Sequence, residues 1–248
     1  MIVTIMPSRS RAQSAQGYLA MGDSCFYCEA TDTALVFYED AYRIAPHERE
    51  TLVRLVRAYS DMGWLHLHKD TSAQRYYECA ALYADTLLAL DPQNPSSHFW
   101  AALTRGSLIP FSTVSQKLHL GKEVRAQANE TIRLDSTFAL AYIILAIFER
   151  ESARLSWFER TIAKIIFGED LHGSFTESEA LLNKAVKYDP ENSYAYYEFY
   201  WTYRAEGKKD AAAESLKKVM SLPVHSQREE RQRELAKNYL ADLESSEH

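Results

Sequence analysis

The chain has 248 residues and a formal net charge of −6, from 28 Lys and Arg against 34 Asp and Glu. Glycine (8) and proline (7) are sparse, which favours helices and argues against a sheet-rich fold with many turns. The charge balance provides no basic stripe of the kind that nucleic-acid-binding proteins carry. No run approaches the roughly 18 apolar residues of a membrane-spanning helix, so no transmembrane segment is predicted.

The start of the chain differs in composition from the rest. An apolar stretch at residues 1–6 precedes residues 7–16, which are small, polar and basic. Residues 1–15 are therefore predicted to be a disordered tail or, alternatively, the end of a secretory signal. Three cysteines at irregular spacing do not form a disulfide framework and leave the compartment open. A cytoplasmic location is favoured, with export to the periplasm as the alternative.

A recurring turn divides the remainder of the chain. Five apolar helical stretches end in Ile-Ala-Pro, Leu-Asp-Pro, Leu-Asp-Ser, Tyr-Asp-Pro and Leu-Pro. Recurrence at intervals of about 33 to 54 residues is typical of stacked helical hairpins. The sequence predicts an all-α fold, an α-α superhelix (a right-handed solenoid) of about five hairpins. It forms one domain over residues 16–243, followed by a disordered tail at 244–248.

The first hairpin is predicted to have helices at residues 16–29 and 32–45. Gly22 is a small residue at the expected helix crossing, and Tyr38 is expected to fill the gap between neighbouring hairpins. Pro46 ends the second helix because it cannot donate the next helical hydrogen bond. This pattern of about 34 residues resembles the tetratricopeptide repeat (TPR).

The three middle hairpins are longer than a standard repeat, whereas the fifth, from Pro190 to Pro223, is close to standard length. A charged helix at 227–243 has the composition of a cap that ends a solenoid. The helices of the middle hairpins are predicted at residues 48–66, 72–90, 96–108, 112–134, 138–152 and 175–188, with an inserted helix at 155–167.

The inserted segment carries a more specific resemblance. It reads Leu-Ser-Trp-Phe-Glu-Arg from Leu155 and ends in Phe-Gly at Gly168, a run that resembles the regulator of microtubule dynamics family. The resemblance spans roughly residues 30–243 and implies a repeat scaffold, some of whose relatives associate with microtubules. Glu159 and Arg160 are expected to form ion pairs with neighbouring helices. The residues interpreted as the packing faces of the insert are Trp157, Phe158, Ile162, Ile165, Ile166 and Phe167.

Few residues indicate catalysis or cofactor binding. Cys25 and Cys28 form a lone Cys-x-x-Cys on a predicted helix, with no preceding strand and no second pair, so a packing role is favoured. A disulfide between them is expected only if the protein is exported. His66 and His68 point to different faces of a helix. The sequence contains no Gly-rich phosphate loop and no nucleophile elbow. No cofactor, no metal and no enzymatic activity are predicted.

The concave face of a helical solenoid is lined mainly by the first helix of each hairpin. Aromatic and arginine side chains at these positions would suit an extended or helical peptide, with aromatic anchors and arginines that pair with carboxylates. The Lys and Asn pattern of chaperone-tail-binding repeats is absent. The predicted partner-binding residues are Phe26, Tyr27, Arg57, Phe99, Arg150, Tyr194, Tyr197, Trp201 and Arg204.

The aromatic residues of the fifth hairpin allow a second interpretation. Tyr194, Tyr197 and Trp201 could instead pack in the core under the C-terminal helix, covered by its apolar stripe at Leu235, Tyr239 and Leu243. With either arrangement, the predicted function is a non-enzymatic scaffold that binds a protein or peptide partner. The alternative is an exported or periplasmic accessory protein that binds a small ligand or docks on a transporter.

Overall fold

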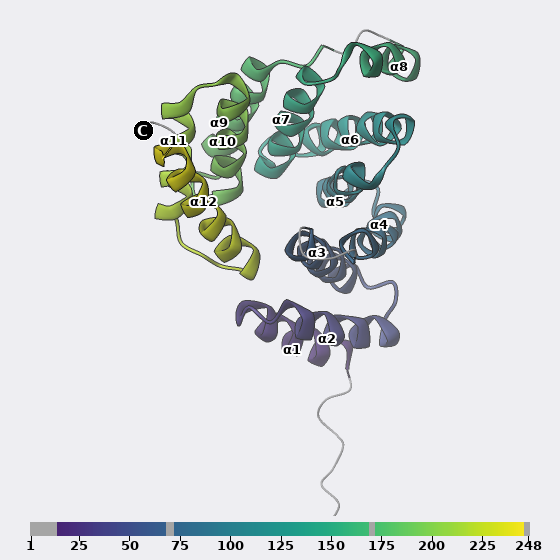
Figure 1. The fold of residues 1–248 in the computed structure, drawn as a ribbon. Helices are drawn as coiled ribbons and strands as arrows, with labels where there is room; N and C mark the ends of the chain where they lie inside the picture. The colour runs from purple at the N-terminus through teal and green to yellow at the C-terminus, as the bar shows by residue number, and fades with distance from the viewer. Residues whose placement is uncertain (1–13, 68–71, 169–171, 246–248) are drawn as a thin grey trace, which may run out of the picture.

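The computed structural model describes residues 14–67, 72–168 and 172–245. Over these residues the chain forms twelve α-helices, one short 3-10 helix and no strand. The helices stack into a curved array with a concave inner side (Figure 1). The all-α superhelix predicted from the sequence is confirmed. The predicted tails lie almost wholly outside the described residues, and α1 already begins at Ala15.

Five helix pairs form the repeating hairpins, and a twelfth helix follows them. In the fourth hairpin α7 packs on α9, because α8 is the inserted helix and contacts α6 instead. The elements are α1 (Ala15–Tyr27), α2 (Thr31–Ile44), α3 (Arg49–His66), α4 (Ala73–Leu90), α5 (Pro95–Leu108), η1 (Ile109–Phe111), α6 (Val114–Leu134), α7 (Ala139–Ala153), α8 (Trp157–Phe167), α9 (Phe175–Tyr188), α10 (Ser193–Glu206), α11 (Lys209–Ser221) and α12 (Gln227–Ser245).

The recurring turn has one backbone geometry in four of its five occurrences. Ala45, Asp91, Asp135 and Asp189 follow their helices with φ between −137° and −143°. Each donates its N–H to the carbonyl oxygen four residues earlier, which satisfies one of the last helical acceptors. Asp135 keeps this geometry although Ser136 replaces the usual proline. The proline is therefore not needed for the turn to form.

Close helix crossings depend on glycine under a tyrosine ring. A Cβ atom on Gly22 would lie 2.4 Å from Cε1 of Tyr38, so the ring occupies the space that a side chain would fill. Tyr38 thus closes the crossing inside its own hairpin, and its hydroxyl donates to Asp23 Oδ1 at 2.9 Å. The same contact recurs in the second hairpin between Gly63 and Tyr77, at 2.6 Å.

Replacement of Gly63 by alanine is expected to destabilise the protein by about 1–3 kcal/mol, because the new methyl group overlaps the Tyr77 ring. That residue is only 4% exposed, and three of its ring atoms would lie within 2.8 Å of the new methyl carbon. Gly106→Ala is the matched control, since its Cβ would meet nothing closer than 3.8 Å. Removing a helical glycine there should stabilise by about 0.5–1 kcal/mol. Urea denaturation of both variants measures the difference, and equal effects would contradict the packing described.

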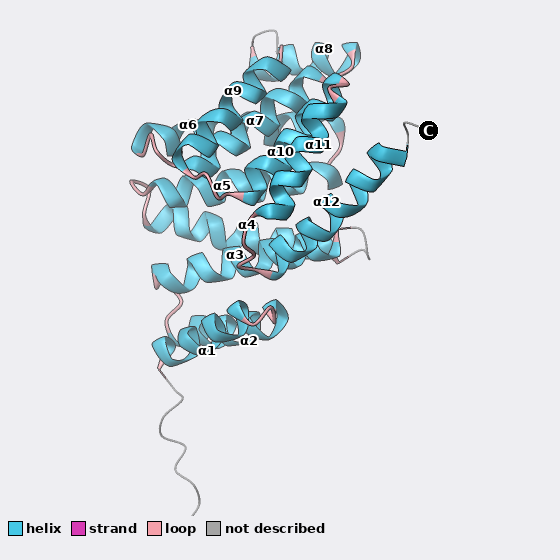
Figure 2. Ribbon diagram, turned by 90° about the vertical axis from the view of Figure 1, so that its left-hand side faces the viewer, coloured by secondary structure: helices cyan, strands magenta, loops and turns pink. Residues whose placement is uncertain are grey.

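The C-terminal helix α12 covers the end of the array and reaches back to its first half. It packs on α11 and α10 and also contacts α3 (Figures 1 and 2). The Tyr239 ring stacks on Tyr200 with centroids 5.3 Å apart and meets Trp201 edge-on at 5.5 Å. The cap predicted at 227–243 therefore does more than end the solenoid, because it bridges two distant hairpins.

The inserted helix α8 is held by its own end residues. Ser156 and Glu159 form a reciprocal capping box, and Gly168 ends the helix in the left-handed conformation with φ 77°. As expected, Glu159 pairs with a neighbouring helix, through Lys117 of α6 at 3.5 Å. Arg160 departs from the expectation in donating to the backbone carbonyls of residues 153 and 155.

The packing of α8 differs from the sequence-based prediction. Ala163, with Ile162 and Ile166, packs against Leu118 of α6. Trp157, Phe158 and Ile165 are instead 80%, 53% and 80% exposed, so the prediction that they pack internally is wrong. The reason is that α8 packs mainly on α6, in a cluster that also includes Phe148 of α7, and leaves its opposite face uncovered. The side chain of Phe167 lies outside the described part of the structure.

Candidate partner-binding face

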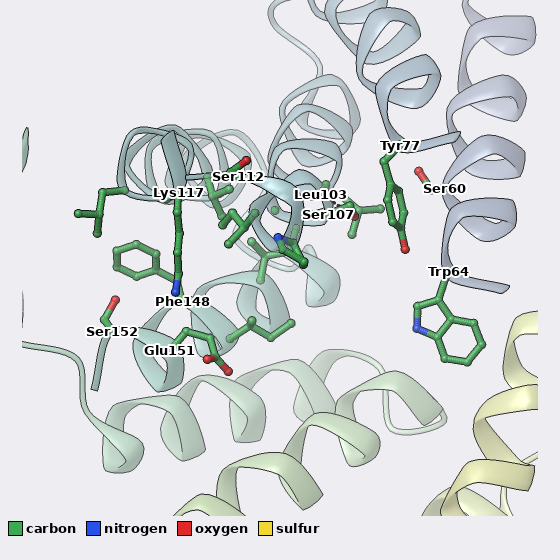
Figure 3. Close-up of a pocket in the computed structure, with 18 of the residues that line it drawn as sticks. Ser60, Trp64, Tyr77, Leu103, Ser107, Ser112, Lys117, Phe148, Glu151 and Ser152 are labelled. Carbon is green, nitrogen blue, oxygen red and sulfur yellow. Dashed lines mark hydrogen bonds between the residues drawn. The ribbon is translucent and has the colours of Figure 1, made fainter. Parts of the chain in front are cut away.

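The concave side encloses a cavity of about 610 Å³. It extends from Trp64 and Tyr77 at one end to Phe148 and Lys117 at the other, with Leu103 and Ser107 between them (Figure 3). A second cavity of about 390 Å³ adjoins it and is lined by more charged residues, among them Asp61 and Glu229. The residues that line both cavities are Ser60, Leu103, Ile144, Tyr194 and Arg228.

Helical spacing explains how these residues come to one side. On α3, Arg57, Ser60 and Trp64 are three and four residues apart and therefore share a face. On α7, Ile144, Phe148 and Glu151 follow the same spacing. First helices of consecutive hairpins thus form the inner wall, as predicted. The second helix α6 and the 3-10 turn η1 also contribute, because the third hairpin is longer than a standard repeat.

Arg228 of α12 joins distant parts of the concave face. Its guanidinium lies 5.4 Å from the Trp64 ring and 5.1 Å from the Tyr194 ring, and it donates to Asp61 Oδ1 at 3.4 Å. Burial raises the pKa of Asp61, and the positive charge of Arg228 opposes that shift. Arg228 therefore ties α12 to α3 and α10 at the junction of the two cavities.

A second buried ion pair lies beside the cavity, between α7 and α10. Arg150 donates to Glu198 Oε2 at 2.7 Å, and both side chains are less than a tenth exposed. Arg150 also contacts Glu151 at 3.0 Å, and Glu151 lines the larger cavity. The Arg150 side chain thus pairs with the buried carboxylate of Glu198 and with the half-exposed carboxylate of Glu151.

The structure separates the nine predicted partner-binding residues into groups. Arg57, Phe99 and Tyr194 line one or both cavities. Arg57 also stacks on Phe26, with its guanidinium 4.2 Å from the ring centroid. Tyr27 is 72% exposed and lines neither cavity.

Three predicted residues lie in the interior and line neither cavity. Phe26, Arg150 and Tyr197 are 4%, 7% and 6% exposed. They offer no surface to a partner, so the prediction that they contact one is wrong. Helical spacing identified an inward face for each but not the neighbouring helix that covers it.

Two of the three aromatic residues in question, Tyr197 and Trp201, follow the core interpretation, whereas Tyr194 lines both cavities. Tyr197 and Trp201 belong to one apolar cluster with Leu235, Tyr239 and Leu243 of α12. Arg204 is exposed at its edge, with its guanidinium 5.3 Å from the Trp201 ring. The C-terminal helix thus covers most of the aromatic surface that the sequence placed in a groove.

Several cavity residues were missed by sequence reasoning. Trp64 lies on the same face of α3 as Arg57, and helical spacing could have identified it. Arg228 carried no signal, because its partner Asp61 is 167 residues away in the sequence. Ser107 and Phe148 line the cavity because the third and fourth hairpins curve around it, and curvature cannot be inferred from periodicity.

The residues considered for redox or metal chemistry have ordinary surroundings. Cys25 is partly buried against the first core cluster, Cys28 is exposed, and both are free thiols. The His66 ring lies 5.3 Å from Tyr76, whereas His68 is outside the described residues. Among residues 14–67, 72–168 and 172–245, no group of three His, Cys, Asp or Glu could hold a metal ion. None of the helices described there is long and apolar enough to cross a bilayer.

The hairpins and their inner cavity define a TPR-like helical-repeat protein. A TPR protein of Thermus thermophilus superposes on this chain with a TM-score of 0.66. The match covers 92% of this chain and 100% of that one at 15% sequence identity, so it establishes the fold alone.

Within that class, the chain belongs to the family described as regulator of microtubule dynamics protein 1-3, whose model matches residues 18–244. Regulator of microtubule dynamics protein 2 of Mus musculus is 26% identical over 181 residues, 71% of this chain and 43% of that protein. Regulator of microtubule dynamics protein 1 of Pongo abelii is 22% identical over 204 residues, 82% of this chain and 65% of that protein. The chain thus spans less than two thirds of either relative.

Proposed function

We propose that this protein is a non-enzymatic scaffold that binds a protein or peptide partner through its concave face. The observation that carries the proposal is the 610 Å³ cavity, whose walls come from helices of four hairpins and from α12. Trp64, Leu103 and Phe148 give it apolar walls. Burial of one large apolar side chain there would contribute about 1.5–3 kcal/mol to binding. An apolar anchor residue of a peptide fits this chemistry.

Serine hydroxyls add polar positions to the cavity wall. Ser107 and Ser112 are partly exposed and line the larger cavity. Each hydroxyl donates to the backbone carbonyl four residues earlier, at 2.9 Å. Each hydroxyl oxygen can still accept a hydrogen bond from a backbone N–H of an extended peptide.

Peptides selected from a random library against the wild-type protein test the proposal. Ser107→Phe places a ring in the cavity and should weaken the binding of selected peptides about tenfold or more. Ser115→Phe is the matched control, because Ser115 is exposed on α6 and lines neither cavity. Equal binding to wild type and Ser107→Phe would place the peptide site elsewhere and refute the proposal.

A second candidate is an exported or periplasmic accessory protein that binds a small ligand or docks on a transporter. The cavity volume favours its ligand-binding part, since pockets for small molecules typically measure about 300–1,000 Å³. Native mass spectrometry of protein purified from its own host discriminates the two candidates. A co-purifying small molecule that Ser107→Phe loses would support the second.

Microtubules are the partner that family membership suggests, because the relatives carry microtubule dynamics in their names. The concave face of this chain would then bind a tubulin segment. Co-sedimentation with microtubules at low salt tests this, with Ser107→Phe as the comparison. A wild-type protein that stays in the supernatant would exclude microtubules as the partner.

A further inference from the structure

The uncovered face of α8 carries a group of exposed apolar side chains. Trp157 and Ile165 are each 80% exposed, and Phe158 is 53% exposed, although all three are large and apolar. At 100° per residue they fall within an arc of about 100° of the helix, so they form one patch. The opposite arc, at Ala163, is fully buried against α6. One face of the helix therefore packs in the core, and the opposite face makes no packing contribution to the fold.

We propose that this patch, formed by Trp157, Phe158 and Ile165, docks the protein on the surface of a lipid bilayer with anionic headgroups. The helix lies at one edge of the helix array (Figure 1). Its Glu159 lines the larger cavity, but none of the three patch residues lines either cavity. A protruding apolar edge can enter the soft interface of a bilayer, whereas a protein partner would have to supply a matching groove. Tryptophan and phenylalanine on such a face are typical of helices that lie in the membrane interface.

Basic residues border the patch. On α8 itself, Arg160 and Lys164 outnumber Glu159, which is engaged in the capping box and with Lys117. Lys122 of α6 is exposed and reaches the carbonyl of Ile166 at 3.0 Å, at the C-terminal end of α8. Arg154, just before the helix, is 58% exposed and pairs with Glu151 at 3.2 Å. Among the described residues around the patch, the basic side chains outnumber Glu151 and Glu159, and this local charge complements anionic headgroups.

The size of the patch argues against a second copy of the chain as its occupant. An 11-residue helix is about 16 Å long, and its three exposed side chains offer a few hundred Å² at most. A stable protein interface buries about 800 Å² on each partner. A bilayer has no such requirement, because each inserted side chain contributes independently by leaving water.

The helix is also preformed. The capping box at Ser156 and the left-handed Gly168 fix both ends before any contact is made. An amphipathic segment that must fold at the membrane loses part of its binding free energy to ordering. Because α8 is already helical and anchored to α6 through Ile162 and Ala163, that cost does not arise here.

Vesicle flotation tests the proposal, with phosphatidylcholine vesicles that contain roughly a quarter phosphatidylglycerol. The wild-type chain should bind. The double variant Trp157→Ser, Ile165→Ser should bind at least about tenfold more weakly. Leu82→Ser is the matched control, since Leu82 is 68% exposed on α4, away from the patch. Tryptophan emission should shift to the blue on vesicle binding in wild type, and Trp157→Phe should remove that shift.

Three outcomes would overturn the proposal. They are a wild-type protein that does not float with the vesicles, a double variant that binds as wild type does, and a self-association that the double variant abolishes. The last would identify a second copy as the occupant. Ser107→Phe should bind vesicles normally, because none of the three patch residues lines the cavity that this substitution fills. Failure of the peptide-binding proposal is therefore distinguishable from failure of this one.

Discussion

Glu198→Ala is expected to lower the free energy of unfolding by about 3–5 kcal/mol, because it leaves the buried guanidinium of Arg150 without its main partner. The two side chains are 8% and 7% exposed and meet at 2.7 Å. A charge removed from water is tolerated only when a nearby opposite charge and hydrogen bonds replace its hydration. Glu151 would still pair with Arg150, but its carboxylate is about half exposed and therefore replaces little of the lost interaction.

The control variants separate charge from packing. Glu151→Ala should cost no more than about 1 kcal/mol, because that pair is partly solvated. Arg150→Met combined with Glu198→Met should cost much less than Glu198→Ala, since no charge stays buried. Urea denaturation of the wild type and these three variants measures the free energy of unfolding of each protein. A Glu198→Ala variant no less stable than Glu151→Ala would contradict the buried pair.

Tyr200→Ala is expected to destabilise the C-terminal part of the superhelix by about 3–5 kcal/mol. Tyr200 is among the largest fully buried side chains, and its ring stacks on Tyr239 of α12. Removal of the ring leaves a cavity between α10 and α12. In a solenoid each repeat is stabilised by its neighbours, so the loss should concentrate in α10 to α12. Hydrogen exchange should show faster opening there than in α3 and α4.

Two variants control this prediction. Tyr200→Phe keeps the ring and loses only the hydroxyl, which accepts a hydrogen bond from Arg204 at 3.0 Å, so the expected cost is about 0.5–1.5 kcal/mol. Tyr27→Ala removes a tyrosine that is 72% exposed and should be close to neutral. Uniformly faster exchange along the whole chain after Tyr200→Ala would argue against a locally held cap.

Helix boundaries could be predicted closely from this sequence. The helices expected at 72–90, 112–134 and 155–167 are observed as Ala73–Leu90, Val114–Leu134 and Trp157–Phe167. Apolar spacing and the recurring turn are local signals, and local signals determine where a helix begins and ends. Even the turn without proline, at Asp135, was found from its preceding helix.

The candidate site was predicted less well, because it depends on which helices meet. Arg57, Phe99 and Tyr194 were placed on the correct side, since helical spacing gives the inner face of each hairpin. The coverage of Tyr197 by α12 and the bridge from Arg228 to Asp61 depend on the curvature of the whole array. Curvature is the sum of small rotations between repeats, and the chain carries no local signal for it.

The exposure of Trp157 also depends on which helices meet, and it could not be predicted from helical spacing. An apolar residue on a helix is normally assigned to the core, and no pattern in the sequence indicated that α8 would pack mainly on one helix. The number of helices around an inserted element is a property of the assembled fold. Exposed apolar residues in such an insert are therefore candidates for function.

The most direct test of the concave-face proposal would be to determine a crystal structure of this protein bound to the selected peptide with the highest affinity. An apolar peptide side chain is expected in the larger cavity, between Trp64, Leu103 and Phe148. A peptide bound on the convex face, with the cavity unfilled, would contradict the proposal.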